Sequence, residues 1–232
     1  AREKVPAYVV GGYVRDILLG RVSSDIDIMV EGDGIAFAKK LATALKVDIT
    51  VDYDKFGTAL IPHPLLEIEV ASARKEEYEA DSRKPQVTYT TVEEDMSRRD
   101  FTINAIAASI LPDTFGKLYD PLGGIKDLQK GLIITPLDPD ETFSDDPLRM
   151  LRAVRFAAQL QYKVAPTTLD SISRNVKRME IISWERIRDE IIKSLRTDKP
   201  SIAFYLMRET GLLAHVFPEL DIMSGVDIIK GM

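Results

Sequence analysis

The stretch Gly11–Ile28, GGYVRDILLGRVSSDIDI, carries the most information on the fold. It follows a short apolar run, Ala7–Val10, which indicates a strand, and two adjacent glycines let the next turn bring backbone N–H groups close to an anion. Tyr13–Leu19 is predicted to form one short helix that ends at Gly20. Asp25–Val30 then alternates carboxylate and aliphatic side chains, which is the period of a β-strand. A glycine turn followed by a helix start suits a bound triphosphate.

The strand that ends this stretch carries two aspartates, Asp25 and Asp27. They share one face of the strand, whereas Ile26 and Ile28 face the core. Neighbouring carboxylates repel, so their sharing a face indicates a cation between them, although an exposed strand alone would also explain the pair. Paired carboxylates and substrate phosphates commonly bind Mg²⁺, and two such ions could activate a hydroxyl and stabilise leaving pyrophosphate.

Composition restricts the remaining classes of function. Apolar residues make up 45% and charged residues 29% of the 232 residues, which is typical of a globular protein and excludes a collagen-like or wholly disordered chain. The absence of Cys excludes disulfides, thiolate zinc sites and cysteine nucleophiles. His63 and His215 are the only histidines, so a metal is expected to be held by oxygen. Without a long apolar run or a basic-then-apolar leader, we expect no membrane association and a cytoplasmic location.

Charge divides the chain unevenly. Residues 1–144 contain 17 Lys and Arg against 25 Asp and Glu, and residues 145–232 contain 14 against 12. The acidic first part argues against non-specific nucleic-acid binding, DNA included, although a solvated acidic surface would have the same balance. We predict two units, 1–140 and 141–232, the second of them helical.

Periodicity predicts most of the elements. In the first unit it favours a helix over Gly34–Leu45, a hairpin of Phe56–Ile61 and Leu65–Ala71, a second helix over Asp100–Ser109 and a short strand at Leu132–Thr135. Arg74–Pro85 is polar without periodicity and is interpreted as a mobile loop. The second unit is predicted to contain four helices, Pro147–Leu160, Thr167–Val176, Trp184–Lys193 and Ser201–Glu209.

A second motif, RRDFTINA, covers Arg98–Ala105. Arg99 is a candidate phosphate ligand, Asp100 could accept hydrogen bonds from ribose hydroxyls, and Asn104 would support them. The alternative is an exposed helix start that Asp100 caps.

A third motif, DDPLRMLRAVR, covers Asp145–Arg155. Asp146 and Arg149 are neighbours on a helix, and a carboxylate that accepts beside a guanidinium that donates matches the edges of cytosine and adenine. Uracil and guanine present the donor and the acceptor in the reverse order. Binding either of them would leave buried groups unmatched, at a cost on the order of 1–3 kcal/mol for each group. Arg152 and Arg155 continue at three-residue steps and could follow a triphosphate. The alternative is an ordinary helix start in which acidic residues precede basic ones, an order that the helix dipole favours.

Gly11–Ile28 resembles the signature of the polymerase-β-type nucleotidyltransferases, and the three motifs together are similar to the class II group of tRNA CCA-adding enzymes and bacterial poly(A) polymerases. The resemblance implies an α+β fold, in which a head with a mixed five-stranded sheet is followed by an all-helical neck. It implies metal binding by Asp25 and Asp27. The superfamily often has a third carboxylate on a neighbouring strand, for which Glu69 is the candidate, and the alternative is that Glu69 is an ordinary exposed acid of its strand. The implied nucleotide-binding residues are Gly11, Gly12, Arg15, Arg99, Asp100, Asn104, Asp146, Arg149, Arg152 and Arg155.

The function implied by the resemblance is template-independent, Mg²⁺-dependent addition of CMP and AMP, from CTP and ATP, to the 3′ end of tRNA. A-only addition and polyadenylation are alternatives within the group, and a nucleotide- or RNA-binding domain without catalysis is an alternative of another class. A degenerate domain usually loses the carboxylate pair, so Asp25 and Asp27 favour an enzyme. Family members usually continue into a body and tail that grip tRNA, and we expect this chain to be a fragment.

Overall fold

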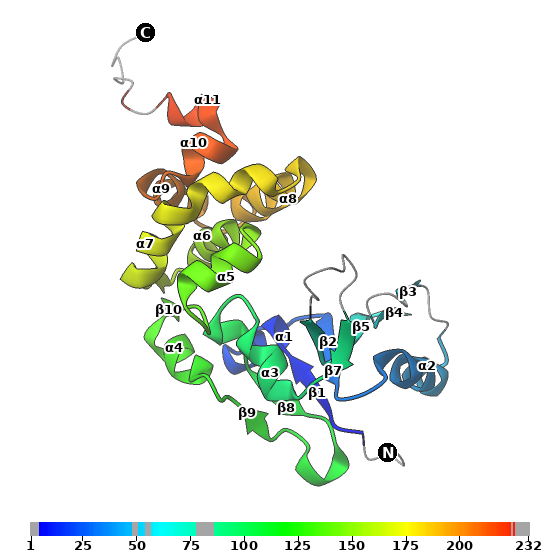
Figure 1. Ribbon diagram of the computed structural model, residues 1–232. Helices are drawn as coiled ribbons and strands as arrows, with labels where there is room; N and C mark the ends of the chain where they lie inside the picture. Colours follow the sequence, from blue (N-terminus) through cyan, green and yellow to red (C-terminus); the bar gives the residue numbers. More distant parts are fainter. Residues whose placement is uncertain (1–4, 48–50, 54–56, 78–85, 224, 226–232) are drawn as a thin grey trace. The chain divides into compact units, whose positions relative to one another are not determined.

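The computed structural model describes residues 5–47, 51–53, 57–77, 86–223 and 225. The chain forms two compact units, residues 1–128 and 129–232 (Figure 1). This division comes earlier than the predicted boundary at 140. Strand β10 (Leu132–Ile133) pairs with β11 (Lys163–Val164), and helix α5 (Pro139–Asp145) packs against α7 (Pro166–Asn175). These contacts attach the segment after residue 128 to the helical unit.

A mixed β-sheet forms the centre of the first unit. Only β2 and β5 run parallel within the described part of this sheet, and the other neighbouring strands are antiparallel. The five central strands match the predicted sheet, and the two short strands β3 and β9 extend its edges. In order across the sheet, the strands are β3 (Val51–Tyr53), β4 (Thr58–His63), β5 (Leu66–Ser72), β2 (Asp25–Val30), β1 (Ala7–Val10), β8 (Ala107–Ser109) and β9 (Leu118–Tyr119).

The two faces of the sheet are covered by different apolar clusters. Helix α2 (Gly34–Leu45) packs its buried alanines against β4 and β5, together with Ile28 and Val30 of β2. The opposite face packs Met29 with residues of the short helix α3 (Val92–Ser97). Because side chains alternate along a strand, Asp27 lies on the face of Met29. The predicted strand Asp25–Val30, with its isoleucines turned to the core, is confirmed.

The segment around the second sequence motif is not the predicted helix. Thr102–Asn104 forms one 3₁₀ turn, and β8 (Ala107–Ser109) follows directly, paired with β1 and β9. Ala105, Ile106 and Ala107 are fully buried. A short apolar run of this kind fits a buried strand as well as a helix, so periodicity alone could not separate the two.

Two further predictions in the first unit are partly wrong. The turn between β4 and β5 lies one to two residues later than expected, because Pro62 and His63 still pair with Glu67 and Leu66. Residues 74–77 are not loop but form strand β6 (Arg74–Glu77), which pairs with β7 (Gln86–Tyr89). The rest of the predicted loop, 78–85, and Phe56 of the predicted hairpin lie outside the described residues.

Two short helices complete the first unit. Helix α1 (Gly12–Leu18) follows β1, close to its predicted position. Helix α4 (Gly124–Lys130) begins where the Asp120 carboxylate accepts the backbone N–H groups of Gly124 and Ile125, at 2.6 and 3.0 Å. A side chain at Gly124 would collide with the Thr102 carbonyl oxygen, which explains the glycine. Helix α4 therefore packs closely against the turn that carries the second motif.

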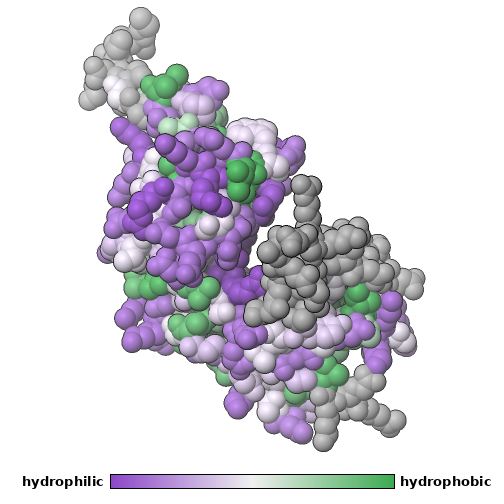
Figure 2. Space-filling view, viewed as in Figure 1, coloured by the Kyte–Doolittle hydropathy of each residue, from purple (hydrophilic) through white to green (hydrophobic). Residues whose placement is uncertain are grey.

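The second unit is built around α6 (Leu148–Leu160), most of which is buried against α8 (Trp184–Leu195) and α9 (Pro200–Glu209). The four predicted helices are present to within two residues at each end, and the α+β class with a helical second part is confirmed. The visible face of this unit is largely hydrophilic (Figure 2). In the part of the chain that is described, no helix is long and apolar enough to cross a membrane. The remaining elements are the 3₁₀ turns η3 (Pro112–Thr114) and η4 (Val176–Ile181) and helices α10 (Leu212–Val216) and α11 (Pro218–Asp221).

Candidate functional site

The carboxylate pair lies at the start of β2. Asp25 is exposed and Asp27 is half-buried. Because β2 and β5 run parallel, Asp25 is in register with Glu67 and Asp27 with Glu69. Residues in register on neighbouring strands point to the same face of a sheet. The fold therefore gathers four carboxylates on one face, next to the end of β1.

The protonation of these groups reflects their crowding. The pKa of Asp27 is raised to about 6, first by burial and then by the negative charges of Asp25 and Glu69, whereas the Arg99 guanidinium lowers it. The pKa of Glu69 is also raised, by burial and by the charges of Asp25 and Glu67. The Arg99 guanidinium offsets these effects only in part, and a bound cation would offset them further.

The two aspartates fit a magnesium ion whose remaining ligands would be waters and substrate phosphates. In the part of the chain that the structure describes, no three His, Asp and Glu side chains are placed to hold a metal ion together. Glu69 is thus an electrostatic neighbour of the aspartates, and the structure does not place it as a third ligand. Mg²⁺ is usually bound through one or two carboxylates, several waters and substrate phosphates, and Asp25 and Asp27 match this pattern.

Gly11 connects the carboxylates to the second motif. It follows β1 with φ of +74°, and its N–H donates to the Ile106 carbonyl oxygen at 3.2 Å. A Cβ atom at this position would lie 2.9 Å from Nη1 of Arg99 and 3.4 Å from Oδ2 of Asp27. Both the backbone conformation and the space therefore require glycine. At Gly12, the first residue of α1, a Cβ atom would lie 3.4 Å from Nη2 of Arg15.

Arg99 is held beside this glycine by Asp95, which is not among the predicted site residues. Nε and Nη2 of Arg99 donate to Oδ2 of Asp95, at 3.3 and 3.1 Å. The two residues are four apart, a spacing at which helical side chains meet, and this spacing could have revealed the pair. Asp95 fixes the Arg99 guanidinium near Gly11 and Asp27.

Arg15 and Asn104 belong to one buried network. Arg15 is 4% exposed, and its Nε and Nη2 donate to the Asp16 carboxylate at 2.9 and 3.0 Å. Its Nη1 donates to Oδ1 of Asn104 at 2.6 Å, and Nδ2 of Asn104 donates to Oδ1 of Asp100 at 3.0 Å. The same Asp100 oxygen accepts the N–H of Phe101 at 2.8 Å. The first two motifs are therefore joined, and nucleotide contact by Arg15, Asp100 and Asn104 stays a prediction.

In the helical unit, the third motif is organised by α8. Asp146 precedes α6, and its Oδ1 accepts the N–H of Leu148 at 3.1 Å. Its Oδ2 accepts Nη2 of Arg186 from α8, at 2.8 Å. Nη1 of Arg149 donates to the Thr142 carbonyl oxygen at 3.5 Å. The acid and the base of the predicted base-reading pair are each held by a further contact within this unit, and base reading itself stays a prediction.

The other two arginines of this motif share a buried acid. Arg155 is 7% exposed, and its Nε donates to Oε2 of Glu190 at 2.6 Å. Its Nη1 donates to Oε1 of Gln159 at 2.7 Å, and its guanidinium carbon lies 3.9 Å from the centre of the Phe156 ring. Nη1 of Arg152 lies 3.9 Å from Oε1 of Glu190. Arg186 and Glu190 are four apart on α8, so helical spacing places them on one face, but no local pattern in the sequence pairs them with Asp146 and Arg155.

Two family models match the chain. The model described as "Poly A polymerase head domain" matches residues 7–134, more than half of the sequence. The chain belongs to the poly A polymerase head family. A second model, described as "Probable RNA and SrmB- binding site of polymerase A", matches residues 161–223.

Relatives in the poly A polymerase head family are named as tRNA nucleotidyltransferases. The chain is 38% identical over 220 residues to the A-adding tRNA nucleotidyltransferase of Geobacter sulfurreducens, covering 94% of this chain and 25% of that protein. It is 38% identical over 217 residues to the CCA-adding enzyme of Geobacillus kaustophilus, covering 93% of this chain and 52% of that protein. The chain thus spans between a quarter and about half of the length of these curated relatives.

Solved structures of the same kind share the fold. One, described as tRNA nucleotidyltransferase complexed with a primer tRNA and an incoming ATP analog, has a TM-score of 0.81 and 36% identity. The match covers 92% of this chain and 59% of that chain. A CCA-adding enzyme in complex with ATP has a TM-score of 0.79 and 36% identity, covering 93% of this chain and 49% of the other.

Proposed function

We propose that this chain carries the catalytic and nucleotide-selecting part of a tRNA nucleotidyltransferase, which adds CMP and AMP to an RNA 3′ end without a template. The observation that carries the proposal is the crowded carboxylate pair of Asp25 and Asp27. This pair lies beside Gly11 and the Arg99 guanidinium. The name of the Geobacillus kaustophilus relative, CCA-adding enzyme, supports this activity.

In this proposal Asp25 and Asp27 hold Mg²⁺, which when bound would neutralise phosphate charge and lower the pKa of the attacking hydroxyl. The oxygen of the RNA 3′ hydroxyl gives up its proton to solvent and attacks the α-phosphorus of the nucleotide. The bond from that phosphorus to its leaving oxygen breaks, and pyrophosphate departs. Arg99, oriented by Asp95, donates hydrogen bonds to the phosphate oxygens. Gly11 leaves the space that the phosphates need. Catalysis consists of positioning and charge stabilisation, without a protein nucleophile.

Recognition of the nucleotide is assigned to the second and third motifs. Asp100, held by Asn104, accepts hydrogen bonds from ribose hydroxyls, and the network behind it fixes its orientation. The Asp146 carboxylate accepts a hydrogen bond from the base edge, and the Arg149 guanidinium donates one to it. This pattern matches cytosine and adenine and mismatches uracil and guanine. Arg186 positions the Asp146 carboxylate for this contact. Arg152 is the better candidate for a triphosphate contact, since Arg155 is more deeply buried.

The proposed substrates are CTP, ATP and the 3′ end of tRNA, with a cytoplasmic location. A-only addition is the second candidate, because the chain is 38% and 40% identical to proteins of Geobacter sulfurreducens and Aquifex aeolicus named A-adding tRNA nucleotidyltransferases. Polyadenylation, which uses the same chemistry, is the third candidate activity. A domain that only binds nucleotides would have no use for the repulsive carboxylate pair.

The test uses three tRNAs that end at the discriminator base, in C-C or in C-C-A, each offered CTP, ATP, UTP or GTP separately. CCA addition predicts incorporation of C onto the first and of A onto the second, whereas A-only addition predicts incorporation onto the second alone. Asp25→Ala is expected to abolish incorporation while ATP still binds. Asp113→Ala, which removes an exposed acid of η3, is the matched control and should remain active. A fully active Asp25→Ala variant would refute the proposal.

A further inference from the structure

The predicted base-reading pair is divided between two helices. Asp146 directly follows α5, Arg149 lies in the first turn of α6, and only Asp146 and Pro147 separate the two helices. The Arg149 side chain also contacts α5, since its Nη1 donates to the Thr142 carbonyl oxygen at 3.5 Å. The spacing between the Asp146 carboxylate and the Arg149 guanidinium therefore depends on how α5 is placed against α6.

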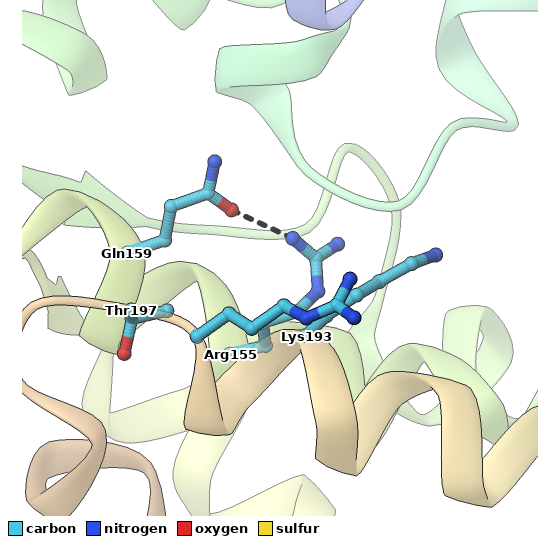
Figure 3. Close-up of a pocket in the computed structure, with 5 residues that line it drawn as sticks. Arg155, Gln159, Lys193 and Thr197 are labelled. Atoms are coloured by element: carbon cyan, nitrogen blue, oxygen red, sulfur yellow. Dashed lines mark hydrogen bonds between the residues drawn. The ribbon is translucent and has the colours of Figure 1, made fainter.

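Helix α6 has anchors of its own. Most of it is buried, and it packs against α8 and α9. In its C-terminal half, Nε of Arg155 donates to Oε2 of Glu190 on α8 at 2.6 Å, and Nη1 donates to the Gln159 side chain (Figure 3). Helix α5 has only seven residues, and isolated helices shorter than about 12–15 residues are marginal in water. Its placement therefore depends on its contacts with neighbouring elements.

Asp140, in the first turn of α5, binds this helix to α7. Its carboxylate accepts Nη2 of Arg174 at 3.0 and 2.9 Å. It also accepts Nδ2 of Asn175 at 2.8 Å and the hydroxyl of the buried Ser171. These hydrogen bonds, the one from Ser171 first among them, hold the pKa of Asp140 below its ordinary value, so that the carboxylate is ionised at neutral pH. Three side chains of one helix thus converge on one acid of another.

A further contact fixes the other end of α5. Nη2 of Arg178, in the η4 turn that follows α7, donates to the Ser144 carbonyl oxygen at 2.8 Å. Arg174 and Arg178 are four residues apart, as are Asp140 and Ser144, so two arginines bind α5 at its first and last turns. Phe143, which is fully buried, holds α5 to the core between these turns. Apolar contacts are not directional, whereas hydrogen bonds are, and the polar contacts therefore set the position of α5 along α7.

We propose that Asp140 is a positioning residue for base selection, which fixes α5 on α7 and so holds the Asp146 carboxylate at the spacing from Arg149 that matches cytosine and adenine. This inference rests on the proposed function for the role of Asp146 and Arg149 in reading the base. Asp140 acts through the backbone of α5, whereas Arg186 of α8 binds the Asp146 carboxylate directly. Selection of the base thus draws on a residue six positions before the acid that reads it.

The test compares the affinities of the chain for ATP, GTP and inorganic tripolyphosphate, which has no base. Asp140→Ala removes the acceptor of three side chains, and the ratio of ATP affinity to GTP affinity should fall about 3- to 10-fold, the factor that one hydrogen bond usually contributes. Binding of tripolyphosphate should not change. Asp140→Asn keeps one acceptor oxygen and should retain a higher ratio than Asp140→Ala. The matched control Glu141→Ala removes the other acid of the same turn, about 100° around the helix, and should keep the ratio of the unchanged chain.

Thermal unfolding first shows whether each variant folds. A folded Asp140→Ala variant with an unchanged ratio, or an equal fall in Glu141→Ala, would overturn the proposal. Equal losses of ATP, GTP and tripolyphosphate binding would also overturn it, because they would indicate that Asp140 only stabilises the helical unit. If Asp140→Ala does not fold, Arg174→Ala takes its place, since it removes a side chain that is 58% exposed. It should lower the ratio about twofold, and an unchanged ratio would overturn the proposal.

The test also separates this proposal from the proposed function. Because binding is measured, a chain that prefers ATP to GTP through Asp140 but transfers no nucleotide would contradict the proposed function alone. An unchanged chain that does not distinguish ATP from GTP would contradict base reading by Asp146 and Arg149, and this proposal with it.

Discussion

Nη1 of Arg15 donates to Oδ1 of Asn104 at 2.6 Å, and this buried contact joins two motifs that lie 89 residues apart. Arg15 comes from α1, directly after the glycine turn, and Asn104 comes from the 3₁₀ turn that precedes β8. A charge-assisted hydrogen bond inside the protein is stronger than one at the surface, and its loss takes an acceptor away from a buried N–H group of Arg15. The glycine turn and the ribose-contact candidate Asp100 are thus held in one fixed arrangement.

Asn104→Ala is expected to weaken both the fold and nucleotide binding. The change removes the acceptor for Arg15 and the donor to Asp100, and an unsatisfied buried group costs about 1–3 kcal/mol. Urea unfolding should show this loss, and ATP affinity should fall because Asp100 loses its support. Ser97→Ala, which removes an exposed hydroxyl bonded to the Glu94 carbonyl, is the control. Stability equal to that of the unchanged chain would show that the network is not structural.

Gly11→Ala should abolish activity by a steric route. The new methyl would lie 2.9 Å from Nη1 of Arg99, and the φ of +74° strains any side chain, at about 1 kcal/mol. Gly20→Ala is a matched control, because Gly20 has φ of +69° and no atom of the described residues lies within 4 Å of the added carbon. Both variants should lose similar backbone stability in thermal unfolding, but only Gly11→Ala should lose nucleotide incorporation. Equal activities would contradict the role of the glycine in leaving space for phosphates.

Arg186→Ala should relax the choice of base. Without its partner at 2.8 Å, the Asp146 carboxylate can rotate away from the edge that it reads. Because an unmatched buried group costs on the order of 1–3 kcal/mol, the ratio of kcat/KM for ATP over GTP should fall about tenfold. Arg188→Ala, in the same helix, breaks an exposed contact with the adjacent Asp189 and should leave this ratio unchanged. An unaltered ratio in Arg186→Ala would remove Arg186 from the specificity mechanism.

Asp27→Asn should stabilise the metal-free protein above neutral pH while abolishing its activity. The pKa of Asp27 in the folded protein, about 6, exceeds its ordinary value of 3.8, so ionisation disfavours the folded state. Stability linked to this group is complete below pH 3.8 and is lost as the pH rises through about 6. At pH 8 in EDTA the variant should therefore be more stable by about 1–3 kcal/mol, and near pH 4 the difference should vanish. Thermal unfolding at both pH values checks this, and a less stable variant at pH 8 would contradict it.

Elements with strong local signals were predictable from the sequence. The strand Asp25–Val30 and the helix Gly34–Leu45 have the predicted bounds, since alternation and a helical apolar stripe leave little ambiguity. Asp33 also caps the helix, with its Oδ1 accepting the N–H of Ala36 at 2.9 Å. In the same way the glycine turn and the aspartate pair were found from spacing alone.

Features that depend on tertiary pairing were not predictable. Residues 107–109 became a strand because β1 and β9 flank them, which no local pattern records. The partners of Asp146 and Arg155 lie on α8, 40 and 35 residues away, so only the packing of the two helices reveals Arg186 and Glu190. The boundary between the two units lies earlier than predicted for the same reason, because β10 pairs with β11 of the helical unit.

The central claim is that Asp25 and Asp27 hold a divalent ion against the phosphates of a bound nucleotide. The most direct measurement is the anomalous diffraction of a crystal of this chain grown with ATP and Mn²⁺. We predict manganese within about 2.3 Å of carboxylate oxygens of both aspartates and of an ATP phosphate oxygen. Manganese bound elsewhere while ATP occupies the site, or ATP bound there without the metal, would contradict the account.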